Sequence, residues 1–233
     1  MKPPRTLVAA ALAGALLCPT SPADAREAAH AAPAAARLNS QVTIHPFYHQ
    51  QKYRHTFRIS GQVRYSEGAD VYAKAGVQVS LLRRPAGSTR WSRIGTDKTS
   101  QATKPTYKFS VVARTNSTYR VRFAGTKRLE PSHTNAKVYV HRRVPTRLLR
   151  PRPHDLKLAG HVEPAWRHNQ VRLVKRGCKT CNWHVVRRQR TSGTSHFKFS
   201  LDAPRKGSSY YRVQVPGTVK YASSVSATYR TYR

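Results

Sequence analysis

Cys178, Cys181 and His184 form the most distinctive chemical pattern of the sequence, with the spacing C-x2-C-x2-H. In an oxidising compartment, two cysteines this close favour a small disulfide. Thiol–disulfide oxidoreductases use the same C-x-x-C spacing, but their attacking thiolate needs a lowered pKa. The pattern also matches part of a zinc site, with His168 as a fourth candidate ligand. We expect a Cys178–Cys181 disulfide with no metal or other cofactor, and thiol redox chemistry is the alternative.

Motifs of the common enzyme classes are absent from the sequence. It contains no G-x-S-x-G, no H-E-x-x-H, no phosphate-binding glycine-rich loop and no EF-hand loop. Beyond residue 25, the only close pair of carboxylates is Glu67 and Asp70, in a Ser-Glu-Gly-Ala-Asp segment typical of a turn. Glycosidase chemistry needs two carboxylates that flank the substrate. We therefore expect a protein that is not an enzyme.

The formal net charge of +34 is spread evenly along the chain. Residues 41–143 hold 20 Lys and Arg against 4 acidic residues, and residues 144–233 hold 19 against 3. Such an excess of positive charge attracts polyanions at low salt. The basic residues come from several segments of the chain. In the β-sandwich fold that the apolar pattern predicts (see below), we therefore expect them to cover both sheets and not to form one groove. The candidate polyanion-binding residues, at expected outward strand positions, are Arg58, Arg64, Lys108, Arg120, Arg122, Lys157, Arg172, Lys198 and Arg212.

The two halves of the chain are copies of one unit, which places the cysteines in a turn. In matching order, the halves contain Val79-Ser-Leu-Leu-Arg-Arg84 and Val171-Arg-Leu-Val-Lys-Arg176, then Trp91 and Trp183, then Tyr119-Arg-Val121 and Tyr211-Arg-Val213. The cysteine pair stands where the first half has a Pro-Ala-Gly turn at residues 85–87. Because the two tryptophans are equivalent, we expect them to pack against the protein in the same way and not to bind sugars.

Each half alternates apolar and polar residues with a period of two. Phe57, Ile59 and Val63 alternate with polar residues in the first half, as Leu156, Leu158 and Val162 do in the second. This period predicts strands with one buried face. About seven short strands in roughly 90–100 residues are typical of a β-sandwich. The sequence predicts an all-β fold with two tandem antiparallel immunoglobulin-like β-sandwich repeats.

These motifs resemble the immunoglobulin-like or fibronectin-III-like repeats of secreted actinobacterial proteins. The resemblance covers G-x-V, V-x-L-x-[RK]-R, a hairpin leading into Trp, [YF]-x-F-S and Y-R-V, in both halves. It implies a β-sandwich that acts as a spacer or adhesive module. The cysteine pair does not follow the Cys…Trp…Cys spacing of antibody domains.

The N-terminal segment predicts export. Lys2 and Arg5 precede a short apolar run, and Ala23-Asp24-Ala25 fits a cleavage site. We expect a signal peptide at 1–25, a flexible leader at 26–40, a first repeat at 41–143 and a second repeat at 144–233. No later segment is apolar enough to span a membrane.

The sequence as a whole predicts a secreted, non-catalytic binding or adhesive module. Its expected partners are anionic cell-surface or matrix polymers, such as a wall polymer or an acidic polysaccharide, and any binding of nucleic acid is expected to be non-specific. The alternatives are an exported thiol redox protein that uses Cys178 and Cys181, and a secreted inhibitor that binds another protein.

Overall fold

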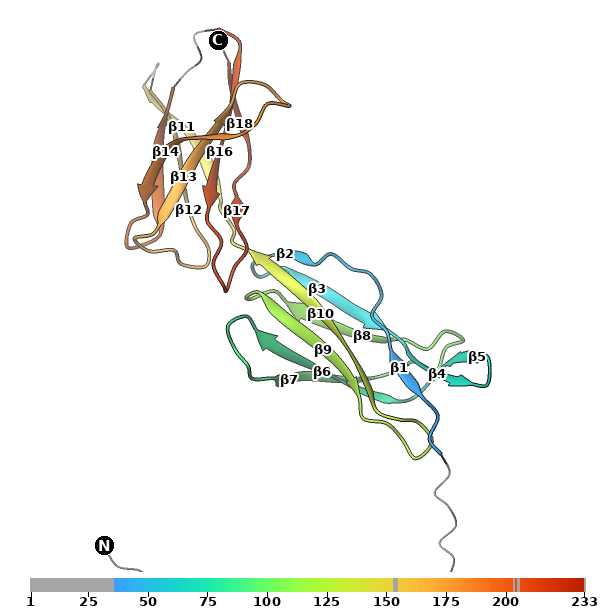
Figure 1. The fold of residues 1–233 in the computed structure, drawn as a ribbon. Coiled ribbons are helices and arrows are strands. Elements are labelled where there is room, and N and C mark those ends of the chain that lie inside the picture. The colour runs from blue at the N-terminus through green and yellow to red at the C-terminus, as the bar shows by residue number, and fades with distance from the viewer. Residues whose placement is uncertain (1–35, 153–154, 203, 205, 233) are drawn as a thin grey trace, which may run out of the picture. The chain divides into compact units, whose positions relative to one another are not determined.

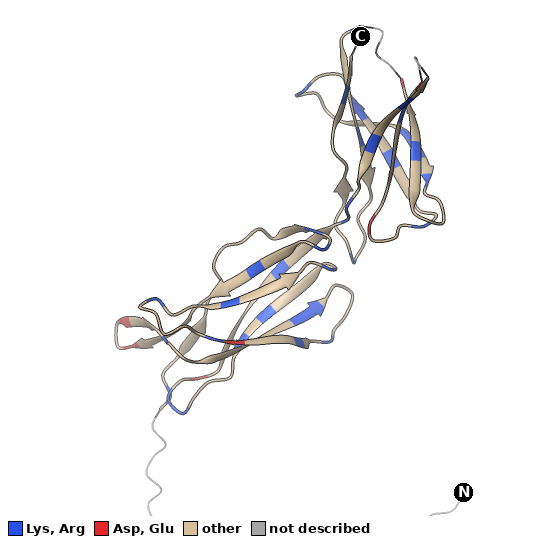
Figure 2. Ribbon diagram, turned by 180° about the vertical axis from the view of Figure 1, so that it is seen from behind, with Lys and Arg blue, Asp and Glu red and all other residues tan. Residues whose placement is uncertain are grey.

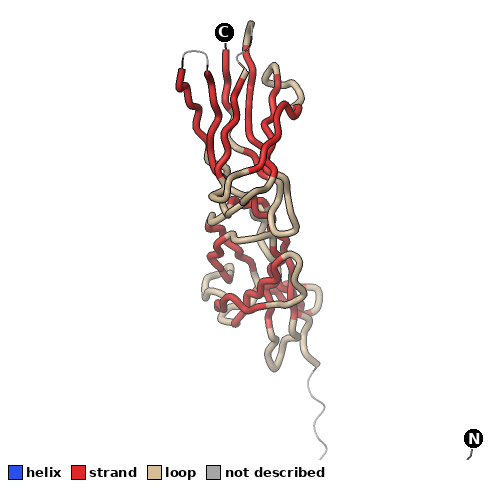
Figure 3. Tube along the Cα trace, turned by 90° about the vertical axis from the view of Figure 1, so that its left-hand side faces the viewer, coloured by secondary structure: helices blue, strands red, loops and turns tan. Residues whose placement is uncertain are grey.

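The computed structural model describes residues 36–152, 155–202, 204 and 206–232. Every regular element in this part of the chain is a β-strand, as the tube in Figure 3 shows. The all-β fold expected from the period-two pattern is therefore confirmed. The predicted signal peptide and most of the predicted leader lie outside the described residues. Strand pairing already begins at Leu38, inside the segment expected to be a flexible leader, because Leu38 packs against the first core and pairs with Leu129.

The first repeat contains ten strands (Figure 1). They are β1 (Ser40–Val42), β2 (Gln50–Lys52), β3 (Thr56–Gly61), β4 (Val63–Glu67), β5 (Asp70–Ala73), β6 (Gln78–Pro85), β7 (Ser92–Lys98), β8 (Tyr107–Val112), β9 (Ser117–Phe123) and β10 (Ser132–His141). One layer is the five-stranded sheet β2-β10-β9-β6-β7. The other layer combines the β3-β8 pair with the β1-β4-β5 sheet. All pairings between these strands are antiparallel except that of β2 with β10, which is parallel.

The described residues of the second repeat form eight strands, again in two sheets. They are β11 (Thr146–Arg152), β12 (Asp155–His161), β13 (Gln170–Arg176), β14 (His184–Arg190), β15 (His196–Leu201), β16 (Ser208–Val215), β17 (Ser224–Val225) and β18 (Tyr229–Tyr232). One sheet is β11-β12-β15. The facing sheet runs β14-β13-β16-β17, and β18 also pairs with β16. This division into two facing antiparallel sheets is that of immunoglobulin-like sandwiches.

Two separate hydrophobic clusters occupy the sandwiches. In β9, the side chains of Tyr119, Val121 and Phe123 are buried while those between them face outward. In β16, Tyr211 and Val213 repeat this pattern. The first cluster draws on strands from β1 to β10, and the second on strands from β12 to β16. Burial of these apolar faces is the main favourable contribution to the stability of each sandwich.

Gly61 and Gly160 stand at equivalent positions where two backbones approach closely. A Cβ at Gly61 would lie 1.8 Å from the carbonyl oxygen of Thr43, and one at Gly160 would lie 2.3 Å from that of Pro145. A larger residue at either position would therefore push the segment that carries Thr43 or Pro145 away from the strand that carries the glycine. The G-x-V motif of the sequence marks this contact in both repeats.

No helix long and apolar enough to cross a membrane occurs in the part of the chain that the structure describes.

Candidate anion-binding faces

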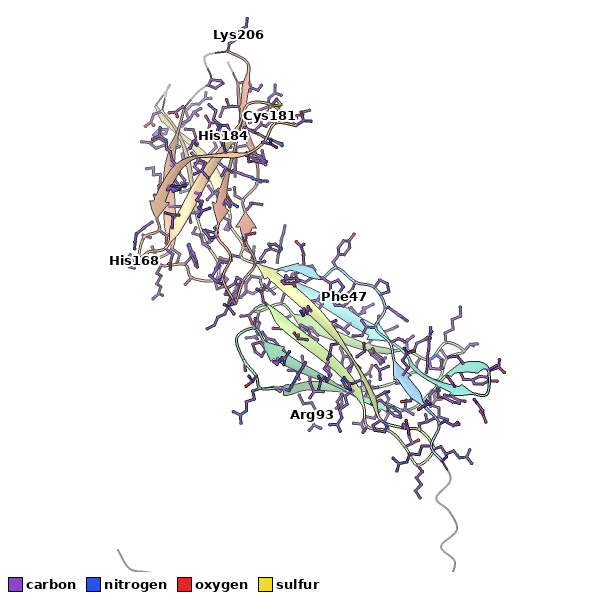
Figure 4. All side chains as sticks on the ribbon, in the orientation of Figure 1. Phe47, Arg93, His168, Cys181, His184 and Lys206 are labelled. Atoms are coloured by element: carbon purple, nitrogen blue, oxygen red, sulfur yellow. A yellow bond between two sulfur atoms is a disulfide. The ribbon has the colours of Figure 1, made fainter. Side chains whose placement is uncertain are left out.

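Cys178 and Cys181 form the expected disulfide in the turn that joins β13 to β14. Both residues are exposed, and the amide of Cys181 also contacts the sulfur of Cys178. The labels of Cys181 and His184 mark this turn in Figure 4. Within the described residues, no three His, Cys, Asp or Glu side chains are grouped so that they could hold a metal ion. The turn leads directly into Trp183, so the disulfide closes the loop that carries this indole.

In the first repeat, two arginines lie over one indole ring. The guanidinium carbon of Arg84 is 4.9 Å from the centroid of Trp91, and that of Arg120 is 4.4 Å from it. Trp91 is half-buried. The Nε of Arg120 donates to Oδ1 of Asn135 at 3.0 Å. A cation over the face of an indole is held by the ring's quadrupole, so both charges are fixed on the outside of the sheet.

The second repeat contains the same cluster at the equivalent residues. The guanidinium carbons of Arg176 and Arg212 lie 4.5 and 4.2 Å from the centroid of Trp183. Arg176 also lies over Tyr210, at 5.4 Å. We call the two groups Arg84–Trp91–Arg120 and Arg176–Trp183–Arg212 the Arg–Trp–Arg clusters. Their recurrence at matching positions means that one sequence motif builds both.

The strand register explains why these residues meet. In the ladder between β6 and β9, Arg84 pairs with Thr118 and Leu82 pairs with Arg120, so the two arginines are diagonal neighbours. Arg176 and Arg212 hold the same diagonal positions between β13 and β16. Diagonal neighbours on one face of a sheet are within reach of long side chains. The six-residue turn before each tryptophan then returns the indole to this face.

Carboxylates are absent from the outer faces that carry the clusters. Strands β13, β14, β16, β17 and β18 contain no Asp or Glu at all. Among the strands of the first five-stranded sheet, the only acidic residue is Asp97, which pairs with the buried Val79 and accepts a hydrogen bond from the amide of Lys108. Asp97 therefore faces the other layer. Figure 2 shows many blue segments on these strands and few red ones.

We call these outer surfaces the first and second basic faces. The first, on β6, β7, β9 and β10, is lined by Arg84, Arg93, Lys98, Arg120, Arg122, His133 and Lys137. The second, on β13, β14, β16 and β18, is lined by Arg172, Arg176, Arg188, Arg212 and Arg230. The ion pairs found in the described part of the chain use other basic residues, namely Arg143, Lys157, His161 and Arg187. The basic residues named for the two faces therefore form no ion pair with a carboxylate of the described residues.

The second cluster concentrates this charge in a partly buried position. Burial, and after it the like charge of Arg176, lower the pKa of Arg212. The Nε atoms of Arg176 and Arg212 are buried and have no hydrogen-bond partner among the described residues. In the first repeat, Asn135 of β10 pairs with Arg120. In the second repeat, the strand next to β16 is interrupted between β17 and β18, so no residue takes this place beside Arg212 in the ladder. A bound anion would offset the repulsion between two such guanidinium groups.

The predicted polyanion-binding residues divide between the two sheets of each repeat, as the sequence suggested. Arg58, Lys108, Lys157 and Lys198 lie on the β3-β8 pair or the β11-β12-β15 sheet, and Arg64 lies on β4. Lys157 forms an ion pair with Asp155 at 2.7 Å. Arg120, Arg122, Arg172 and Arg212 lie on the basic faces. Only Arg120 and Arg212 take part in the Arg–Trp–Arg clusters.

Sequence reasoning missed Arg84 and Arg176 as members of the site. Each is the last residue of the V-x-L-x-[RK]-R motif, and a turn of six residues separates it from the tryptophan. This recurrence was visible in the repeat. It was not informative by itself, because the third member of each cluster comes from a strand far along the chain.

Arg142 stands over aromatic rings too, but it is not part of an accessible surface. Its guanidinium carbon lies 4.1 Å from the ring centroid of Trp166 and 4.3 Å from that of Tyr221. It is only 6% exposed, and burial lowers its pKa. The difference in exposure separates this packing arginine from the half-buried arginines of the clusters.

Comparisons with known proteins identify no family for the chain. No family model matches it, and no curated protein does. Among solved structures, a superoxide reductase (neelaredoxin) from Ignicoccus hospitalis is 10% identical, with a TM-score of 0.33, over 44% of this chain and 80% of that one. A cytokine receptor complex is 12% identical, with a TM-score of 0.39, over 82% of this chain and 95% of that one. Similarities this weak carry no functional inference.

Proposed function

We propose that the protein is a secreted, non-catalytic binding module that associates with anionic cell-surface or matrix polymers through its two basic faces. The observation that carries this proposal is the Arg–Trp–Arg cluster, which is built twice at equivalent positions on faces without a carboxylate. Guanidinium groups present forked donors that match carboxylate and phosphate oxygens. Stacking on tryptophan limits their motion, so less side-chain entropy is lost when an anion binds.

Two copies of the site on one chain strengthen binding to a long polymer. When one face has bound, the second meets the same polymer at a high effective concentration. The affinity for a polymer can therefore far exceed the affinity for a single anionic group. This behaviour suits an adhesive module on a wall polymer or an acidic polysaccharide.

The test compares two sets of charge changes that are equal in number. The face variant carries Arg84→Gln, Arg120→Gln, Arg176→Gln and Arg212→Gln. The control variant carries the same four-charge reduction on exposed positions of the other layers, with Arg58→Gln, Arg64→Gln, Lys108→Gln and Lys198→Gln. Binding to purified cell wall, polygalacturonate, polyphosphate and DNA is measured across a salt series.

The face variant should lose affinity steeply. Its plot of log affinity against log salt should also flatten, because a protein that makes fewer contacts with the polymer releases fewer counterions when it binds. The control variant should keep most of the affinity of the unchanged protein. Equal losses in both variants would mean that net charge alone drives binding and would overturn the proposal. Tight binding to one protein that persists at high salt would favour the inhibitor alternative instead.

A further inference from the structure

Strand β9 carries a row of outward positions along the middle of the first basic face. Thr118, Arg120 and Arg122 alternate with the buried side chains of this strand. Positions two apart on a strand are about 6.6 Å apart, so Thr118 and Arg122 are separated by roughly 13 Å. Neighbouring strands add Lys137 beside Thr118 and His133 beside Arg122.

One end of this row opens into a small concavity of about 290 Å³. Its walls include Arg84, Thr118, Lys137 and Tyr139. Arg84 is also a member of the first Arg–Trp–Arg cluster. The concavity therefore adjoins the cluster, and it is lined by two cationic residues and four residues with hydroxyl groups, without a carboxylate.

The other end of the row opens into a larger concavity of about 600 Å³. Arg93 and Arg122 supply its positive charge, and Ser80 and Thr126 contribute hydroxyl groups. Arg93 pairs with Leu82, which in turn pairs with Arg120 of the cluster. Figure 4 labels Arg93 on this sheet. The cluster thus lies between two cationic concavities on one continuous surface.

The chemistry of the row favours phosphate over carboxylate. A single guanidinium fork matches a carboxylate, whereas a phosphate group can accept from more than one fork at once. Here Arg84 and Arg120 share one indole, and Arg93 and Arg122 share one concavity. Paired guanidinium groups that recur along a strand suit an anion that recurs along a chain.

We infer that the first repeat binds a linear phosphate-bearing chain, which lies along β9 from the Arg84 and Lys137 concavity, across the Trp91 cluster, to the Arg93 and Arg122 concavity. This inference rests on the proposed function and narrows it to a polymer class and a path. Trp91 acts here as the support of the two central arginines, and the ligand contacts their free nitrogen atoms.

The test uses the full protein with Arg176→Gln and Arg212→Gln, so that the second cluster does not contribute. Titration calorimetry compares pyrophosphate with linear polyphosphate of about ten units, a chain long enough to cover a row of roughly 13 Å. Polyphosphate should bind at least tenfold more tightly than pyrophosphate. Adding Arg93→Gln and Arg122→Gln should weaken polyphosphate binding at least tenfold and pyrophosphate binding less than threefold.

A matched control carries Lys74→Gln and Lys104→Gln in the same background, which removes equal charge from exposed positions outside the first basic face. It should change polyphosphate binding less than threefold. If the control weakens binding as much as the Arg93 and Arg122 changes, or if chain length has no effect, the path along β9 is wrong while polyanion binding stands. Equal affinity for polygalacturonate would overturn the assignment to phosphate. If the unchanged protein binds none of these polymers, the proposed function itself fails.

Discussion

The hydroxyl of Tyr211 donates a hydrogen bond to the main-chain carbonyl oxygen of Asp202 at 2.7 Å. This bond ties the start of the β16 ladder to the chain nine residues upstream, in the manner of the tyrosine corner of immunoglobulin-like domains. The equivalent residue of the first repeat, Tyr119, is equally buried, but its hydroxyl has no partner among the described residues. The buried tyrosine at this position therefore forms a hydrogen bond in the second repeat but has no partner among the described residues in the first.

Tyr211→Phe should lower the free energy of unfolding by about 1–2 kcal/mol, because the carbonyl of Asp202 loses its partner in a partly buried position. Tyr119→Phe is the matched control. It should be neutral or slightly stabilising, because it removes a buried hydroxyl without a partner. Urea unfolding of both variants gives the comparison, and an equal loss in the two would contradict it.

Gly61→Ala and Gly160→Ala should each destabilise the protein by about 1–3 kcal/mol or more, because the new Cβ would overlap a backbone carbonyl oxygen. Gly177→Ala offers a control, since a Cβ there would meet nothing within 4 Å. Thermal unfolding should show a clear decrease for the first two variants and little change for the third. If Gly61→Ala unfolds at the same temperature as the unchanged protein, the segment that carries Thr43 can move away from Gly61 without cost, and the prediction is wrong.

Cys178→Ser combined with Cys181→Ser should cost at most about 2 kcal/mol, because the disulfide closes a very short loop. Polyanion affinity and its salt dependence should stay close to those of the unchanged protein. The readouts are urea unfolding and binding to polyphosphate. Loss of a thiol-dependent activity in this variant would support the redox alternative.

Arg120→Lys combined with Arg212→Lys keeps the charge but removes the planar group that lies over each indole. Lysine stacks less well and cannot present a fork of donors. The lost stacking is worth about 0.5–2 kcal/mol at each half-buried cluster, so binding to polyphosphate should weaken several-fold at constant net charge. Unchanged affinity would show that charge alone matters at these positions.

Stability should fall at alkaline pH because burial raises the pKa of Tyr107 well above its ordinary value. A raised pKa in the folded state means that the contribution of Tyr107 is fully present below the unfolded value of about 10 and decreases as pH rises beyond it. Each such group adds a slope of up to about 1.4 kcal/mol per pH unit. Tyr107→Phe should be less stable at neutral pH, because its hydroxyl bonds to Thr43, yet its stability should fall less steeply above pH 10. Parallel curves for the two proteins would contradict this account.

Local pattern was enough to predict the strands and the duplication. The alternation of Phe57, Ile59 and Val63 could be interpreted from neighbouring residues alone, because a strand with one buried face has a period of two. The proximity of Cys178 and Cys181 likewise predicted their disulfide, since two residues three apart need no tertiary structure to meet.

The sequence by itself determined the sign of the surface charge, the β-sandwich architecture and the equivalence of Trp91 with Trp183. Only the tertiary structure decided which arginines stand over those indoles and which faces of the sheets lack carboxylates. Arg84 meets Arg120 through the register of β6 against β9, and that register is set by the packing of Leu81 and Val121 in the core. A shift of one residue would turn every side chain of a strand to the opposite face. The long-range fit of buried side chains therefore places the cationic pairs, and no local sequence pattern specifies that fit.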